Sequence, residues 1–141
     1  MPSSASAPHP GDPVLRIVRV RDVLDTAAEP AELRVLVDRL WPRGVRKDRL
    51  PGIDWDKDAC PSDALRRALH GGGLPREEFA VRYRAELARS GAADALLARA
   101  LGAGTRTLSL LTDVREAESS HAAVLAEVLG EALVEPRGAA G

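Results

Sequence analysis

Three short apolar runs, separated by segments with helix-like composition, constrain the fold of this chain more than any other feature. The runs cover residues 14–20, 34–40 and 107–112. Residues 35–37 of the second run are all apolar, which is typical of a strand buried on both faces of a parallel sheet. Strands that alternate with helices form α/β domains. We therefore predict an α/β fold with a small, mostly parallel sheet flanked by helices.

The segments between the predicted strands carry helix signals. Ser62 is a favourable N-cap for a short helix that runs to about His70. Pro75 suits the first position of a second helix, which runs to about Arg89. Residues 22–33 and 43–61 are predicted as irregular connections. The remaining predicted elements are a helix over 92–101, a helix that begins at Ser119 or Ser120, and a short edge strand at Leu133-Val134.

Length and composition set the boundaries of the predicted domain. The chain has 141 residues, which is the usual size of one domain. Residues 1–13 contain four prolines and three serines, a composition that indicates a disordered tail. We expect a single domain over 14–135 and a second tail over 136–141.

Charge and composition also exclude several classes of function. The net charge of -1 provides no global basic field that would attract nucleic acid. Cys60 is the one cysteine, so the chain has no internal disulfide and no Cys-rich zinc site, and we predict neither metal nor cofactor. No apolar run approaches the roughly 20 residues of a membrane span, and no signal peptide is apparent. We expect a cytoplasmic protein without a membrane partner, and leave its oligomeric state open.

The segment that follows the second predicted strand is unusually basic. Parallel sheets place their binding sites beyond the carboxyl ends of the strands, which selects residues 38–49 and 112–121. Arginine binds phosphate or carboxylate through a planar fork, and glycine lets the backbone approach a ligand closely. The first segment is therefore predicted to be an anion-binding loop, with Arg39, Arg43, Gly44, Arg46, Lys47 and Arg49. The alternative is a solvated loop in which Trp41 closes the core and Asp38 pairs with an arginine.

The second segment contributes a histidine and an acidic residue. The spacing of His121 to Leu125 and Val128 puts it on the buried face of the last predicted helix. A helix N-terminus disfavours imidazolium, so we expect a neutral imidazole suited to general-base chemistry. The alternative is a packing histidine. Asp113, at the end of the third strand, is either a catalytic acid or the partner of Arg115, and we favour the pairing with Arg115.

These residues also carry a family resemblance. The segment Leu36-Val-Asp-Arg-Leu-Trp-Pro-Arg-Gly-Val-Arg-Lys47 resembles the hallmark of the YeaO-like family, domain of unknown function 488. The resemblance covers about residues 14–130, with departures at Cys60, where alanine is usual, and at Ser120, where asparagine is common. It implies an α/β fold and a bacterial, cytoplasmic protein. It supplies no reaction.

The predicted site lies between the loop after the second strand and the start of the last helix. Asp38 and His121 are the candidate catalytic residues, and whether the protein is an enzyme is left open. The leading function is a small enzyme or binder that acts on an anionic small molecule, either phosphorylated or nucleotide-like. The candidate binding residues are Arg39, Trp41, Arg43, Gly44, Lys47, Arg66, His70 and Tyr83.

Two alternative functions remain at this point. The first is a nucleic-acid-associated factor that uses the 39–49 loop together with Arg16, Arg19 and Arg21, and a tryptophan that stacks on a base. The second is a protein–protein interaction module in which Arg and Trp residues are the interface anchors.

Overall fold

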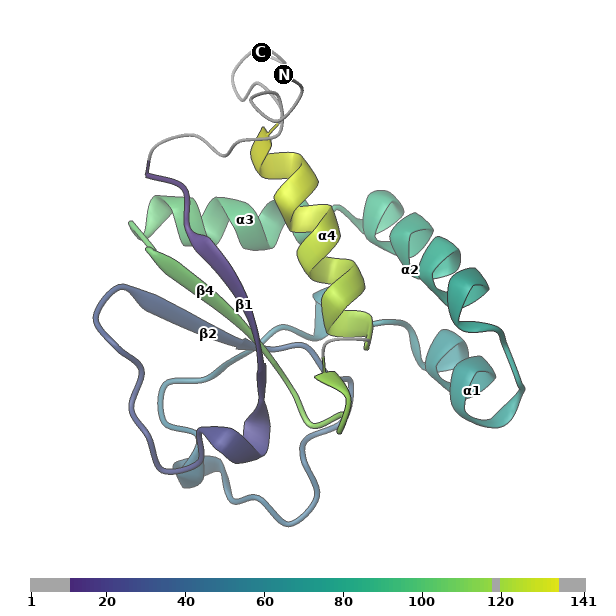
Figure 1. Ribbon diagram of the computed structural model, residues 1–141, viewed down its shortest axis with the longest axis horizontal. Helices are drawn as coiled ribbons and strands as arrows, with labels where there is room; N and C mark the ends of the chain where they lie inside the picture. The colour runs from purple at the N-terminus through teal and green to yellow at the C-terminus, as the bar shows by residue number, and fades with distance from the viewer. Residues whose placement is uncertain (1–10, 118–119, 135–141) are drawn as a thin grey trace.

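A four-stranded parallel sheet forms the centre of the protein (Figure 1). The computed structural model describes residues 11–117 and 120–134, so the predicted tail over 136–141 and most of the tail over 1–13 lie outside the described residues. The strand order is β1-β4-β2-β3, and every pairing is parallel, which confirms the predicted α/β fold. The strands are β1 (Val14–Arg19), β2 (Glu32–Leu36), β3 (Asp54–Trp55) and β4 (Thr107–Thr112).

Four α-helices follow the predicted pattern closely. They are α1 (Asp63–Gly71), α2 (Arg76–Ser90), α3 (Ala92–Gly102) and α4 (His121–Val134). The hydroxyl of Ser62 accepts a hydrogen bond from the backbone N–H of Leu65 at 3.1 Å, so Ser62 is the N-cap of α1 as predicted. No helix in the described ranges is long and apolar enough to cross a bilayer.

The prediction of an edge strand at Leu133-Val134 is wrong. Both residues belong to the last turn of α4. Leu133 is buried because it continues the apolar face formed by Leu125 and Leu129, at a spacing of four residues.

The second strand also differs from its prediction, because it begins at Glu32 and ends at Leu36. The carboxylate of Glu32 accepts hydrogen bonds from Arg34 and from the hydroxyl of Ser109 on β4. These hydrogen bonds satisfy the polar side chains that lie within the strand. The two-residue strand β3 was not predicted, since a strand of that length has no readable period.

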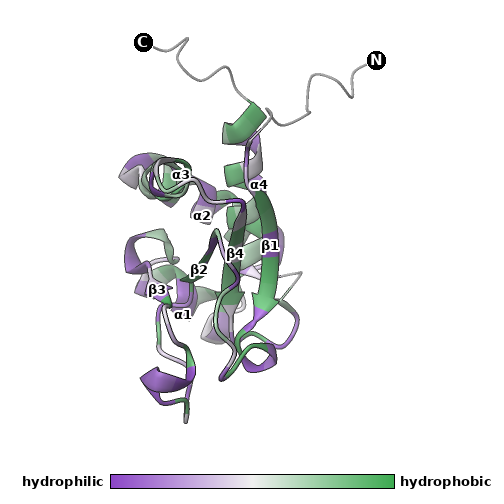
Figure 2. Ribbon diagram, turned by 90° about the vertical axis from the view of Figure 1, so that its left-hand side faces the viewer, coloured by the Kyte–Doolittle hydropathy of each residue, from purple (hydrophilic) through white to green (hydrophobic). Residues whose placement is uncertain are grey.

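The helices and the irregular segments cover opposite faces of the sheet. Val35 and Val37 belong to a hydrophobic cluster that includes buried residues of all four helices. Leu36 points the other way, into a second cluster closed by residues from the connections 20–24 and 41–55. Residues 35–37 are fully buried, as predicted, and hydrophilic residues interrupt the hydrophobic colouring of the strands in Figure 2. The carboxyl ends of β2 and β4 therefore emerge side by side, next to the first turn of α4.

Candidate functional site

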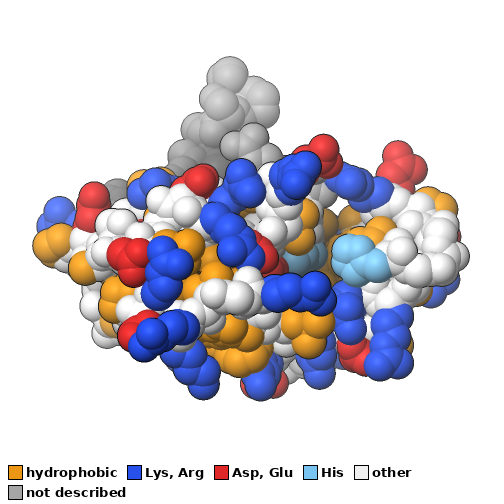
Figure 3. All heavy atoms as spheres, turned by 90° about the horizontal axis from the view of Figure 1, so that it is seen from below, with side chains coloured by type: hydrophobic (Ala, Val, Ile, Leu, Met, Phe, Trp, Pro, Cys, Tyr) orange, Lys and Arg blue, Asp and Glu red, His pale blue; other side chains and the backbone are white. Residues whose placement is uncertain are grey.

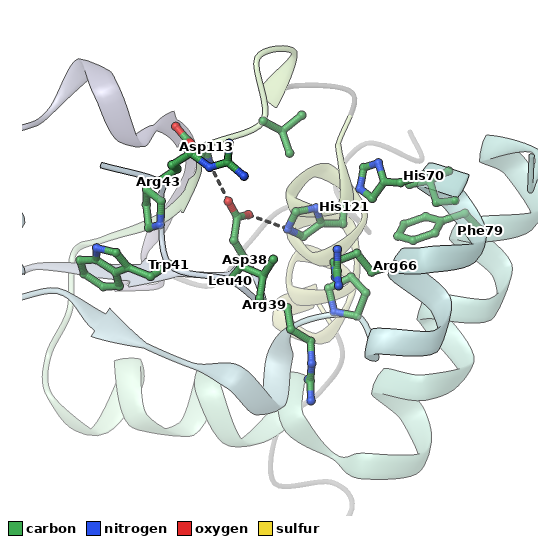
Figure 4. A pocket seen from close by; sticks show the side chains of 14 residues that line it. Asp38, Arg39, Leu40, Trp41, Arg43, Arg66, His70, Phe79, Asp113 and His121 are labelled. Atoms are coloured by element: carbon green, nitrogen blue, oxygen red, sulfur yellow. Dashed lines mark hydrogen bonds and ion pairs between the residues drawn. The ribbon is translucent and has the colours of Figure 1, made fainter. Parts of the chain in front are cut away.

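A cavity of about 330 Å³ lies at the carboxyl ends of β2 and β4 (Figure 4). One wall is the segment after β2, and the opposite wall combines α1, the start of α4 and the segment after β4. Arg43 and His121, which were predicted to share one site, both line this cavity. The full lining is Asp38, Arg39, Leu40, Trp41, Pro42, Arg43, Pro61, Arg66, Leu69, His70, Phe79, Asp113, Val114 and His121.

Asp38 connects the two strand ends to α4. Its Oδ1 accepts a hydrogen bond from the Thr112 hydroxyl at 2.6 Å and lies 3.0 Å from Nε2 of His121. Its Oδ2 accepts from the backbone N–H of Asp113 at 2.7 Å. Asp38 therefore pairs with His121, and the alternative in which it pairs with an arginine is wrong.

The hydrogen-bond partners of His121 determine that its Nε2 carries a hydrogen. Nε2 lies 2.9 Å from the backbone carbonyl oxygen of Val37 as well as close to Asp38. A carbonyl oxygen and an ionised carboxylate only accept hydrogen bonds, so Nε2 is the donor in this geometry. The ring of Tyr83 packs against the imidazole with 6.4 Å between centroids and supports this orientation.

The environment of Asp38 keeps its side chain ionised. Burial raises the pKa of this carboxyl, but the hydrogen bond and charge of His121 and the hydrogen bonds from Thr112 and Asp113 outweigh burial, so the pKa lies below its ordinary value. Both oxygens already accept hydrogen bonds, and a carboxylate of low pKa is a weak base. Asp38 is thus well placed to orient His121.

Arg21 holds the basic loop against the sheet. Its Nε and Nη2 donate to the two carboxylate oxygens of Asp113 at 2.9 and 3.1 Å, and Nη2 also donates to the backbone carbonyl of Arg43 at 3.0 Å. The predicted pairing of Asp113 with Arg115 is therefore wrong. Arg21 reaches Asp113 because β1 pairs with β4, with Arg19 opposite Thr112.

Three arginines line the cavity: Arg39, Arg43 and Arg66. Within the described part of the chain, neither Arg39 nor Arg43 forms an ion pair with a carboxylate. Arg66 pairs with Asp63 at 2.7 Å through Nη2, while its buried Nε has no hydrogen-bond partner among the described residues. In Figure 3, which views the molecule from below relative to Figure 1, Lys and Arg side chains surround a hollow that contains a histidine side chain.

Three of the predicted binding residues lie outside the cavity lining. Gly44 forms the turn after Arg43 with a φ of 78°, and Lys47 is exposed on a short 3₁₀ turn. Tyr83 is fully buried, its hydroxyl donates to the backbone carbonyl of Ala59, and burial raises its pKa well above the ordinary value. Tyr83 therefore packs behind the site.

The two tryptophans form part of the loop-side core. Their rings pack edge to face with 5.3 Å between centroids. The indole N–H of Trp41 donates to the backbone carbonyl of Val45, and that of Trp55 donates to the backbone carbonyl of Asp38. Trp41 thus closes the core, as one of the two interpretations predicted, and also contributes to the cavity wall.

Sequence reasoning did not select the apolar part of the lining. Leu69, Phe79 and Val114 come from three separate segments, and only the packing of α1 and α2 beside the end of β4 brings them together. The one sequence signal was the helical spacing of Phe79 to Tyr83, which indicated core. No group of three or more metal-ligating side chains occurs in residues 11–117 and 120–134.

Comparison with known proteins identifies the family. The model of the inactive DUF488-N3 subclade matches residues 17–140. The chain belongs to this DUF488 subclade. Uncharacterized protein YeaO from Escherichia coli (strain K12) is 38% identical over 112 residues, which cover 79% of this chain and 96% of that protein. The family resemblance noted from residues 36–47 is confirmed, and this DUF488 hallmark begins in β2 and continues into the wall of the cavity.

Mycobacterial relatives show a similar match. Uncharacterized protein Mb3100c from Mycobacterium bovis is 42% identical over 112 residues, which cover 79% of this chain and 92% of the relative. Uncharacterized protein Rv3073c from Mycobacterium tuberculosis matches to the same extent. No solved structure matches this DUF488 chain.

Proposed function

We propose that the cavity binds a small anionic molecule and leaves it chemically unchanged. The observation that carries this proposal is that Arg39, Arg43 and Arg66 all line one hollow. Guanidinium groups form their strongest hydrogen bonds with phosphate and carboxylate. An anion in this cavity would supply the acceptor that Arg39 and Arg43 lack among the described residues.

Binding without turnover is favoured over catalysis for two reasons. The matching family model is described as an inactive subclade. In addition, the low pKa and occupied oxygens of Asp38 make it a poor general base. In this proposal Asp38 and His121 position the walls of the site.

The two alternative functions draw less support from the geometry. Arg46 and Arg49, which would extend a basic stripe for nucleic acid, form ion pairs with Asp48 and Asp25. Both indole N–H groups donate to backbone carbonyls, and the two rings pack against each other, so neither tryptophan stands out as an exposed anchor.

Thermal unfolding in the presence of ligands tests the proposal. Inorganic phosphate, phosphate monoesters and a short single-stranded oligonucleotide are compared on the wild-type protein. A ligand at 100 times its dissociation constant stabilises the fold by about 2.7 kcal/mol, which is easily detected. We expect phosphate compounds to raise the melting temperature, and Arg43→Ala or Arg66→Ala to abolish the rise.

Arg67→Ala is the matched control. Arg66 and Arg67 both pair with Asp63, but only Arg66 lines the cavity, so Arg67→Ala should keep the ligand response. A phosphate response that survives Arg43→Ala would overturn the proposed anion role, and a response to the oligonucleotide alone would favour the nucleic-acid alternative. Release of inorganic phosphate from the monoesters, followed by ³¹P NMR, would contradict binding without turnover.

A further inference from the structure

A second depression adjoins the cavity and extends it. This groove has a volume of about 570 Å³ and lies between α1, α2 and the first half of α4. It shares five lining residues with the cavity, so the two hollows lie side by side. The shared residues are Leu69, His70, Phe79, Val114 and His121.

The two hollows differ in chemical character. The cavity carries Arg39, Arg43 and Arg66, whereas the groove lacks all three. The groove adds the apolar side chains of Ala80, Ala123 and Val124 to the shared residues. Charged side chains of both signs also line the groove, so it has no single-sign field: Arg76, Arg115, Glu116 and Glu127.

The combined size of the site exceeds the need of a simple anion. Ligand pockets for drug-sized molecules have volumes of about 300–1,000 Å³. The cavity of about 330 Å³ and the groove of about 570 Å³ each fall in that range. Inorganic phosphate, with five heavy atoms, would contact the arginines and leave the groove unfilled.

The junction of the two hollows suits a flat apolar group. Leu69 and Val114 are partly exposed there, Phe79 forms a nearly buried base, and the exposed imidazole of His70 offers a planar face. In the close view, His70 and Phe79 lie on the far side of His121 from Arg43 (Figure 4). Nucleic-acid bases stack on aromatic side chains with little dependence on base identity, and His70 is the exposed aromatic ring among these four residues.

We infer that the ligand is a phosphate ester of a planar aromatic group, of the nucleoside monophosphate class. The phosphate lies among Arg39, Arg43 and Arg66, and the ring lies in the groove beside His70 and Val114. This assignment rests on the proposed anion-binding function and adds the second half of the ligand. His121, which lines both hollows, marks the boundary between the two subsites.

Calorimetric titration with three probes separates the two subsites. The probes are adenosine monophosphate, ribose 5-phosphate and adenosine. Stacking contributes about 1–3 kcal/mol per base, so the nucleotide should bind at least about fivefold more tightly than ribose 5-phosphate. Arg43→Ala should weaken both phosphate compounds.

Two variants test the place of the ring. Ala123→Leu fills the groove from α4 without touching the cavity, and His70→Ala removes the planar face. Each should reduce nucleotide affinity to near that of ribose 5-phosphate. In Ala123→Leu, whose residue lies outside the cavity lining, the affinity for ribose 5-phosphate should stay unchanged, which also shows that this variant is folded. Ala95→Leu, an equal enlargement at an exposed position of α3, is the control and should bind both probes as the wild type does.

The possible results distinguish this inference from the proposed function. Equal affinity for the nucleotide and ribose 5-phosphate, with both lost in Arg43→Ala, would overturn the ring assignment and leave the anion site standing. Nucleotide affinity that Ala123→Leu leaves intact would also overturn it. Failure of both phosphate compounds to bind would overturn the inference and the proposed function together.

Discussion

Replacing Asp38 with alanine is expected to destabilise the fold strongly. Asp38 is the acceptor for the Thr112 hydroxyl, the Asp113 N–H and Nε2 of His121, and its side chain is 13% exposed. A hydrogen bond to a charged group contributes about 1.5–3 kcal/mol, and Asp38 accepts three of them. The contributions are not additive, so we expect Asp38→Ala to lower the free energy of unfolding by about 3–5 kcal/mol.

Urea unfolding followed by circular dichroism measures this loss. With a denaturant dependence of about 2 kcal/mol per molar urea, the midpoint should fall by roughly 2 M. Thr112→Val removes one of the three donors and should cost about 1–2 kcal/mol. Asp48→Ala removes an exposed carboxylate of the basic loop and should change stability by less than about 0.5 kcal/mol. A loss below about 1 kcal/mol for Asp38→Ala would refute the view that Asp38 joins the strand ends to α4.

The same carboxylate predicts a pH dependence. Its pKa in the folded protein lies below the ordinary value of 3.8, so its contribution to stability is complete above that pH and declines as the pH falls through the folded pKa. The stability difference between the wild type and Asp38→Asn should narrow as the pH falls below about 4. A difference that instead widens in acid would contradict the assigned direction.

Three further predictions concern other parts of the fold. Burial raises the pKa of Glu32, but hydrogen bonds from Glu29, Ser109 and Arg34 outweigh burial and lower it. Glu32→Gln should therefore destabilise the protein at neutral pH and have a smaller effect below about pH 4.5. Urea unfolding midpoints measured at a series of acid pH values test this. Gly44→Ala should cost about 1 kcal/mol, since φ is 78°, whereas Gly102→Ala at the end of α3 should be neutral or stabilising in the same unfolding assay. Burial raises the pKa of the Cys60 thiol to about 12, so Ellman's reagent should label the native protein far more slowly than the protein in urea, and equal rates would show that the thiol is accessible.

The fold was predictable where local patterns are strong. The strand over residues 107–112 was predicted with its observed ends, and Ser62 marked the start of α1 correctly. Both signals depend on residues that are adjacent in the chain. The sequence did not predict the limits of β2, because Glu32 is stabilised in that strand by a partner on β4 that is distant in the sequence. It did not predict β3, because a strand of two residues has no readable period.

The candidate site was predictable in location but not in connectivity. The rule for carboxyl ends of parallel strands selected Asp38, Arg43 and His121 correctly as neighbours. It could not predict that Arg21 would hold Asp113, because that contact depends on β1 lying beside β4. The rule also could not predict that Tyr83 would be fully buried behind His121.

The sequence by itself therefore determined the alternation of strands and helices, the two faces of the central strands and the family. Hydrophobic period, capping residues and the segment 36–47 are local properties, and each is readable without the fold. The tertiary structure alone decided which charges meet, because an ion pair depends on distances between strand ends and not on separation along the chain. It also placed the three arginines beside the apolar groove of α1 and α4, and that juxtaposition is the basis for both proposals about the ligand.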